Sequence, residues 1–256
     1  MGLEDQLVER DGFEFVETSP GKPVLMLLHG LFGALSNFSE LIDAFKKDYN
    51  VIVPMLPIYY LPKDEAGLGG LLSFTKRFVE HFDLTEMHVL GNSLGGHIAQ
   101  LLVLDSPERI ASLTLTGSSG LFESGMGDGY PRRGDKDYIR KKTAETFYDP
   151  AMVTDDLVEE VFETINDRER VLRIIITAKS ALKHNLADQL HRIHCPTLLV
   201  WGNQDSITPP FVGEKFHELI STSELHFVDK CGHAPMMERP TEFNEILHQF
   251  LERTRE

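Results

Sequence analysis

The stretch MHVLGNSLGGHIAQL, residues 87–101, decides the fold of this chain. Its first four residues, mostly apolar, indicate a buried strand, and a helical pattern begins near Ser93. Between them, Gly-x-Ser-x-Gly at 91–95 predicts a sharp turn, because small residues on either side of the serine let strand and helix pass closely. The serine hydroxyl would then project at a helix N-terminus, where partial positive charge favours a developing anion. Ser93 is the candidate nucleophile, and a plain helix N-cap is the alternative.

Outward from this turn, β-branched apolar runs alternate with stretches of helical period. This rhythm is typical of an α/β fold, with a mostly parallel sheet flanked by helices. The expected strands are an antiparallel hairpin at 7–9 and 13–17, followed by 24–28, 50–54, 87–90, 113–116, 197–201 and 225–228. The expected helices are 36–46, 71–81, 93–105, 211–220 and 241–253.

The alternation of strands and helices is interrupted between Gly120 and Arg192, where the chain is charged and mainly helical in pattern. Helices are expected at 136–146, 155–165 and 168–182. Their apolar stripes, such as Leu157, Val161 and Phe162, should face the main domain. We therefore expect a core domain formed by 1–120 and 193–256, with a helical lid inserted at 121–192.

A serine nucleophile needs a general base, and eleven histidines compete for that role. His233 is favoured because it lies in a glycine-flanked loop after the last expected strand, and α/β sheets bind ligands at the carboxyl ends of their strands. His97, one helical turn beyond Ser93, is expected to pack against the sheet. His29, at the end of strand 24–28, is expected to brace its own loop.

A carboxylate must orient the histidine, and Asp205 lies four residues after the strand 197–201. The chain order Ser, Asp, His is that of the α/β-hydrolases. Asp229 is a rival, but it lies only four residues from His233 on the same loop. For Asp205 the alternative role is turn formation before Pro209. Backbone N–H groups in 29–33, together with that of Leu94, could stabilise an oxyanion.

Four ordered motifs resemble the α/β-hydrolase superfamily: LHGLFG at 28–33, GNSLGG at 91–96, WGNQD at 201–205 and GHAP at 232–235. The resemblance implies an eight-stranded sheet, a helical lid inserted after the sixth strand, no cofactor and a nucleophile elbow at Ser93. It also implies that the N–H of Leu31, the residue after His-Gly, is one oxyanion donor.

Within this superfamily, the serine at the elbow separates the chain from haloalkane dehalogenases and epoxide hydrolases, which carry aspartate there. The segment 91–97 and the Gly-Ser-Ser-Gly-Leu-Phe at 117–122 look like carbon–carbon bond hydrolases that split dienoic ring-cleavage products. The segment 29–33 looks more like small carboxylesterases. At 56–60 the chain has Leu-Pro-Ile-Tyr-Tyr, where relatives often carry an Asp and a Gly-x-Gly-x-Ser stretch.

The leading hypothesis is a serine hydrolase that cleaves a small carboxylic ester through an acyl-enzyme. Carbon–carbon bond hydrolysis of a dienoic substrate is the alternative, and it calls for a basic lid residue such as Arg132, Arg133, Arg140 or Arg173. A third possibility is a ligand-binding relative without turnover.

The composition of the chain restricts the classes of partner that it is expected to bind. The formal net charge of −15 disfavours nucleic acid and anionic membrane surfaces, which leaves a small-molecule ester or related acyl compound as the expected partner. Residues 1–6 show neither a basic start nor an apolar signal, and two cysteines in unrelated contexts suit a reducing compartment. We expect a cytoplasmic enzyme with no metal and no cofactor, and the oligomeric state stays open.

Overall fold

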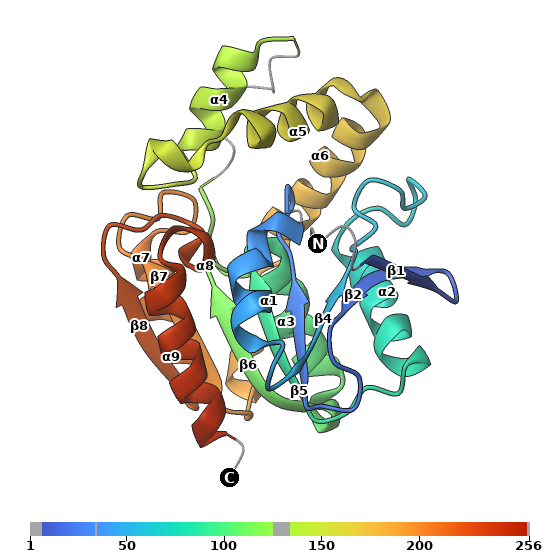
Figure 1. Cartoon of the computed structure of the whole chain (residues 1–256), viewed down its shortest axis with the longest axis vertical. Helices are drawn as coiled ribbons and strands as arrows, with labels where there is room; N and C mark the ends of the chain where they lie inside the picture. Colours follow the sequence, from blue (N-terminus) through green and yellow to red (C-terminus); the bar gives the residue numbers. More distant parts are fainter. Residues whose placement is uncertain (1–6, 34, 125–133, 255–256) are drawn as a thin grey trace.

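An eight-stranded sheet in the order β1-β2-β4-β3-β5-β6-β7-β8 is the centre of the computed structural model, which describes residues 7–33, 35–124 and 134–254 (Figure 1). β1 and β2 form an antiparallel hairpin, β2 is antiparallel to β4, and all other neighbours are parallel. The strands are β1 (Leu7–Arg10), β2 (Phe13–Glu17), β3 (Val24–Leu28), β4 (Asn50–Pro54), β5 (Met87–Asn92), β6 (Ile110–Thr116), β7 (Thr197–Gly202) and β8 (Ser223–Val228). The predicted fold class is confirmed. Residues 1–6, Arg132 and Arg133 lie outside the described residues.

The alternation of β3 shows how the sheet is covered on both faces. Leu25 and Leu27 join one buried cluster, and Met26 and Leu28 join the other, because successive side chains of a strand point to opposite faces. The first cluster includes α1 (Ser39–Phe45), α8 (Pro235–Glu238) and α9 (Pro240–Arg253); the second includes α2 (Leu68–His81), α3 (Leu94–Asp105) and α7 (Pro210–Leu219). Two apolar layers therefore hold the strand ends in place.

Several strands are longer than their apolar runs predicted. β6 begins at Ile110, because Ile110 and the polar Ser112 pair with Met87 and His88 of β5, with a register shift between the two pairs. β8, at the edge of the sheet, begins at Ser223, because the polar Ser223 and Glu224 pair with the start of β7. The helix expected at 36–46 divides into the 3₁₀ helix η2 (Leu35–Phe38) and α1. Pairing with a neighbouring strand, rather than local hydrophobicity, sets these strand limits.

Between β6 and β7, the described chain places the helices α4 (Lys136–Ala144), α5 (Asp155–Asn166) and α6 (Arg168–Lys183) away from the sheet (Figure 1). Asp135, Thr154 and Asp167 cap their N-termini by accepting backbone N–H groups. Their inward faces form a small apolar cluster that includes Ile139 and Ile165. These helices are the lid that we propose for residues 121–192. In the described part of the chain, no helix combines the length and apolarity required to cross a bilayer.

Candidate active site

The elbow between β5 and α3 has the strained geometry that its sequence predicts. Ser93 has φ 54° and ψ −121°, a left-handed conformation that costs a non-glycine residue roughly 1–3 kcal/mol. A Cβ on Gly91 would lie 2.4 Å from the carbonyl oxygen of Gly95, and one on Gly95 would lie 2.0 Å from that of Leu28. Glycine is therefore required at both positions, and Ser93 is held at the start of α3.

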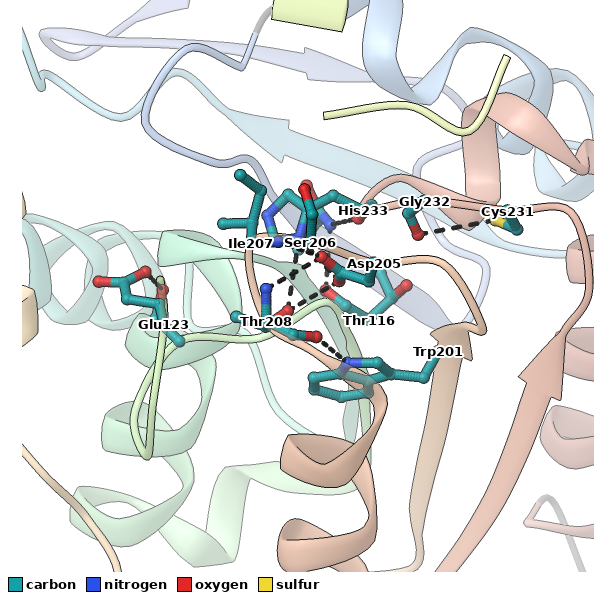
Figure 2. Close-up of polar contacts among 12 residues, drawn as sticks. Thr116, Glu123, Trp201, Asp205, Ser206, Ile207, Thr208, Cys231, Gly232 and His233 are labelled. Atoms are coloured by element: carbon teal, nitrogen blue, oxygen red, sulfur yellow. Dashed lines mark hydrogen bonds and ion pairs between the residues drawn. The ribbon is translucent and has the colours of Figure 1, made fainter. Parts of the chain in front are cut away.

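Asp205 and His233 meet beside this elbow. His233 Nδ1 lies 2.9 Å from Asp205 Oδ2, and both side chains are almost completely buried (Figure 2). Asp229, the rival carboxylate, is exposed and accepts a hydrogen bond from Gln204 Nε2 at 3.2 Å instead. The structure thus places the predicted acid, and not its rival, on the imidazole.

Asp205 is itself held in one orientation. Its Oδ1 accepts the backbone N–H groups of Ile207 at 2.8 Å and Thr208 at 2.9 Å. Its Oδ2 accepts the Thr208 hydroxyl at 2.8 Å in addition to the imidazole (Figure 2). The same carboxylate therefore closes the turn and contacts the imidazole of His233. The sequence analysis missed Thr208, whose only local signal was its place after a polar turn.

Two opposing effects act on the pKa of His233. Burial of the ring lowers this pKa, while the charge of Asp205 and its hydrogen bond to the ring raise it. The net result is a pKa above the ordinary value of 6.5. An imidazole accepts a proton only when it is neutral, so His233 would be able to act as a general base only as the pH rises through this raised pKa.

The backbone of His233 is fixed as well as its side chain. Its N–H donates to the carbonyl oxygen of Thr146 at 2.8 Å, and its carbonyl oxygen accepts from Asn92 Nδ2 at 3.1 Å. Asn92 Nδ2 also donates to the carbonyl oxygen of Thr116 at 3.0 Å. Asn92, the residue before Ser93, therefore ties the elbow to the histidine loop, a contact that was not predicted from the sequence.

The two rival histidines near the elbow have structural environments. The N–H of Leu56 donates to His29 Nε2 at 3.2 Å, so His29 Nδ1 carries the proton and donates to Gly30 O at 2.9 Å. This agrees with a bracing role. His97 is fully buried, pairs with Nδ1 of His184 through its Nε2 at 3.1 Å, and has its pKa lowered by burial to about 3.

A cavity of about 590 Å³ lies above the elbow, and both Ser93 and His233 line it. Leu31 and Leu94, the predicted oxyanion donors, line it too. The N–H of Leu94 belongs to the first turn of α3, where backbone donors have no intrahelical partner. Most of the wall is apolar and comes from the proposed lid, including Ile139, Phe147, Leu157, Val161, Ile165, Ala178, Ala181 and Leu182.

The cavity also has charged groups. Glu123 accepts a hydrogen bond from the Ser119 hydroxyl at 2.7 Å, and Lys142 donates to Glu145 at 2.9 Å. Of the four arginines considered for an anionic substrate, the two among the described residues lie elsewhere. Arg140 donates to Val153 O and pairs with Asp155, whereas Arg173 donates to Leu61 O and pairs with Glu169. Among the described residues, no group of three or more His, Cys, Asp or Glu side chains gathers to hold a metal.

Comparison with known proteins agrees with this fold. Residues 23–240 match the family model described as the alpha/beta hydrolase fold. A 2-hydroxy-6-oxononadienedioate/2-hydroxy-6-oxononatrienedioate hydrolase of Escherichia coli O81 (strain ED1a) is 30% identical, over 93% of this chain and 90% of that protein. An alpha/beta hydrolase from a lagoon-sediment metagenome of Mar Chica, Morocco, is 36% identical, with a TM-score of 0.79 over 96% of this chain and 98% of that one. The 2-hydroxy-6-oxo-6-phenylhexa-2,4-dienoate hydrolase of Rhodococcus sp. strain RHA1 shares the fold, with a TM-score of 0.79, 23% identity and 94% of each chain covered.

Proposed function

Because the chain belongs to the α/β-hydrolase family, we propose that Ser93 is its nucleophile, His233 its general base and Asp205 the acid that orients the base. The observation that carries this proposal is the buried Asp205–His233 contact of 2.9 Å at the cavity that Ser93 also lines. The N–H groups of Leu31 and Leu94 would stabilise the anionic tetrahedral intermediate.

For the substrate, we propose the carbon–carbon bond of a dienoic diketo acid. The similarity to the hydrolase from Escherichia coli O81 supports this choice, since it extends over 93% of the chain. The motif at 91–97 pointed to the same class of enzyme. The sequence analysis placed ester cleavage first, and the relatives favour the opposite order.

The proposed residues can carry out this cleavage. Ser93 Oγ attacks the ketone carbon beside the scissile bond while His233 takes the hydroxyl proton. The carbon–carbon bond breaks, its electron pair passes into the conjugated fragment, and the proton on His233 completes that product at carbon. Water, deprotonated by His233, then hydrolyses the acyl-enzyme and releases a carboxylic acid. The electron pair needs a conjugated carbonyl to receive it, so the substrate must react in its keto form.

Lys142 is the cation on the described cavity wall that could meet the carboxylate of such a substrate. It extends from α4 and is paired with Glu145, so substrate binding would require this exposed pair to open. An exposed pair of this kind contributes little to stability, so substrate binding can readily offset its loss.

Hydrolysis of a neutral carboxylic ester is the second candidate, and Glu123 favours it. Its carboxylate lies on the cavity wall and would repel a substrate anion in its vicinity, while the apolar lid side chains suit an uncharged acyl chain. The chemistry is the same as above, except that the leaving group is an alcohol.

One assay separates the two substrates. A dienoic diketo acid and a series of aryl esters of increasing acyl length are given to the wild-type protein, to Ser93→Ala and to Lys142→Met. Faster turnover of the diketo acid than of any ester, with a loss of about tenfold or more in Lys142→Met for the acid alone, supports carbon–carbon cleavage. Turnover of esters alone, abolished in Ser93→Ala, assigns the enzyme to esters.

A serine-directed fluorophosphonate tests the step that both substrates share. An activated Ser93 should be labelled within minutes at neutral pH, and Ser93→Ala should not be labelled. Absence of labelling in the wild-type protein would overturn the hydrolase proposal and favour a ligand-binding relative without turnover.

A further inference from the structure

The chain segment just after α4 lies directly on both loops of the candidate triad. We call residues 145–148 the 145–148 linker. Ser206 Oγ, next to Asp205, donates to the carbonyl oxygen of Glu145 at 2.8 Å. The N–H of His233 donates to the carbonyl oxygen of Thr146 at 2.8 Å. The proposed lid therefore contacts the acid loop and the histidine loop through its backbone.

A single carboxylate joins the linker to the histidine loop. Glu238, the last residue of α8, accepts the N–H of Gly232 at Oε1, at 2.8 Å, and the N–H of Tyr148 at Oε2, at 2.7 Å. Charged acceptors make hydrogen bonds about twice as strong as neutral ones. Both donors are backbone groups, so the side chain of Glu238 alone determines whether this bridge forms.

The 145–148 linker packs so closely against Gly232 that no side chain fits between the linker and the histidine loop. A Cβ on Gly232 would lie 2.6 Å from the carbonyl oxygen of Thr146 and 2.9 Å from the nitrogen of Tyr148. Phe147, between these two residues, lines the cavity and packs against both the core cluster and the lid cluster. A movement of α4 away from the cavity would carry the linker with it and remove the acceptor of the His233 N–H.

We propose that Glu238 is a positioning residue that couples the seating of the lid to the alignment of His233, an inference that rests on the proposed hydrolase function. With the linker seated, the histidine is held at Nδ1 by Asp205, at its carbonyl oxygen by Asn92 and at its N–H by Thr146. When the linker leaves, the third contact is lost. Under this proposal, the imidazole of His233 is aligned for proton transfer only while the lid covers the cavity.

The variant Glu238→Gln tests this coupling. Glutamine keeps the size of the side chain, but its amide nitrogen cannot accept, so one of the two N–H groups loses its partner. We expect kcat to fall about tenfold or more with KM changed less than about twofold, because a displaced base affects the reaction more than binding. Hydrogen exchange at the amides of Tyr148 and His233 should accelerate about tenfold or more. Glu245→Gln, the same charge change at an exposed position of α9, should alter neither quantity.

Gly232→Ala displaces the same linker without removing a charge, because its Cβ would occupy the space of Thr146 O. It should reproduce the loss of kcat. The two variants differ in pH dependence: the charge of Glu238 raises the pKa of His233, so Glu238→Gln should move the midpoint of the pH profile to lower pH, and Gly232→Ala should not.

Fluorophosphonate labelling of Ser93 distinguishes failure of this inference from failure of the proposed function. If the wild-type protein is not labelled, the hydrolase function is wrong. If wild type and Glu238→Gln are labelled at the same rate, Glu238 does not position the base and the inference is overturned. Slower labelling of Glu238→Gln, together with faster exchange in the linker, supports it.

Discussion

The loops that carry Asp205 and His233 and the inserted helices α4–α6 differ in the polar interactions that they make. In the loops, Asp205 and His233 are buried and each makes several hydrogen bonds to neighbouring turns. On the helices, the charged side chains form exposed pairs such as Lys136–Glu159, which contribute little to stability in water. The loops at the strand ends therefore hold the candidate triad residues in one arrangement, whereas side-chain changes on the helices can alter the shape of the cavity without moving those residues.

The helices are nevertheless attached to the core on two sides of the cavity. On the side of α4, the 145–148 linker bonds to the triad loops. On the side of α6, Ser180 Oγ accepts the N–H of Leu68 at 3.2 Å, and His184 pairs with the buried His97. The comparison predicts that substitutions in the loops reduce the rate for every substrate, and that substitutions on the helices change the ranking of substrates.

The largest expected effect tests the loops at the nucleophile. Ser93→Ala should fold normally and lose about three or more orders of magnitude in kcat, because the nucleophile is gone while the oxyanion donors remain. Circular dichroism and steady-state kinetics measure the two quantities. His29→Ala is the matched comparison, since we assign that histidine to bracing; an equal loss of kcat would show that this assignment is incomplete.

The next effect tests which carboxylate orients the base. Asp205→Asn should lower kcat/KM by roughly a hundredfold or more at neutral pH, and Asp229→Asn should have a much smaller effect. Because Asp205 raises the pKa of His233, the midpoint of the pH profile should also move to lower pH in Asp205→Asn. A large loss in Asp229→Asn, with Asp205→Asn active, would mean that the acid is misassigned.

A smaller effect tests the helices. Alanine at Leu157, Val161 or Leu182, which line the cavity, should change the relative rates along a series of acyl lengths by roughly tenfold, the lower end of the effect of one methylene in an apolar pocket. Leu172→Ala, on the exposed surface of α6, is the control and should leave the ranking unchanged. Unchanged relative rates for all three cavity variants would argue against the lid as the determinant of chain length.

The smallest effect concerns stability at the contact between α3 and α6. The pKa of buried His97 is lowered to about 3, so below pH 6.5 the unfolded chain binds a proton that the folded chain does not. The free energy of unfolding should therefore decrease, by up to about 1.4 kcal/mol per pH unit, as the pH is lowered. His97→Gln cannot titrate, and urea unfolding between pH 7 and 4 should show a shallower decline. An equal slope in both proteins would exclude His97 as the cause.

Local patterns were sufficient to predict the architecture and to nominate the site residues. At the elbow, the need for glycine at position 91 is local, since a Cβ there would collide with the backbone of Gly95 and Gly96. A Cβ on Gly95 would instead collide with the carbonyl oxygens of Leu28 and His29, which the end of β3 brings to this point. The alternation in β3 likewise follows from its own four buried residues. The choice of Asp205 over Asp229 came from spacing, and the structure brings Asp205 to His233. The catalytic roles of these residues stay predictions.

Other contacts were not predictable because they join positions far apart in the chain. Thr146 reaches His233 only after α4 packs over the cavity, and Glu238 binds Tyr148 from 90 residues away. The direction of Arg140 and Arg173, away from the cavity, depends on how the inserted helices pack.

The sequence by itself determined the strand, turn and helix of the elbow and the order of the candidate triad, because steric limits on small residues and the period of apolar residues act within a few neighbours. Tertiary structure alone decided the shape of the cavity and the bonds between lid and triad. An apolar helix face can pack on many surfaces, and only the assembled sheet selects the one that brings the 145–148 linker to His233.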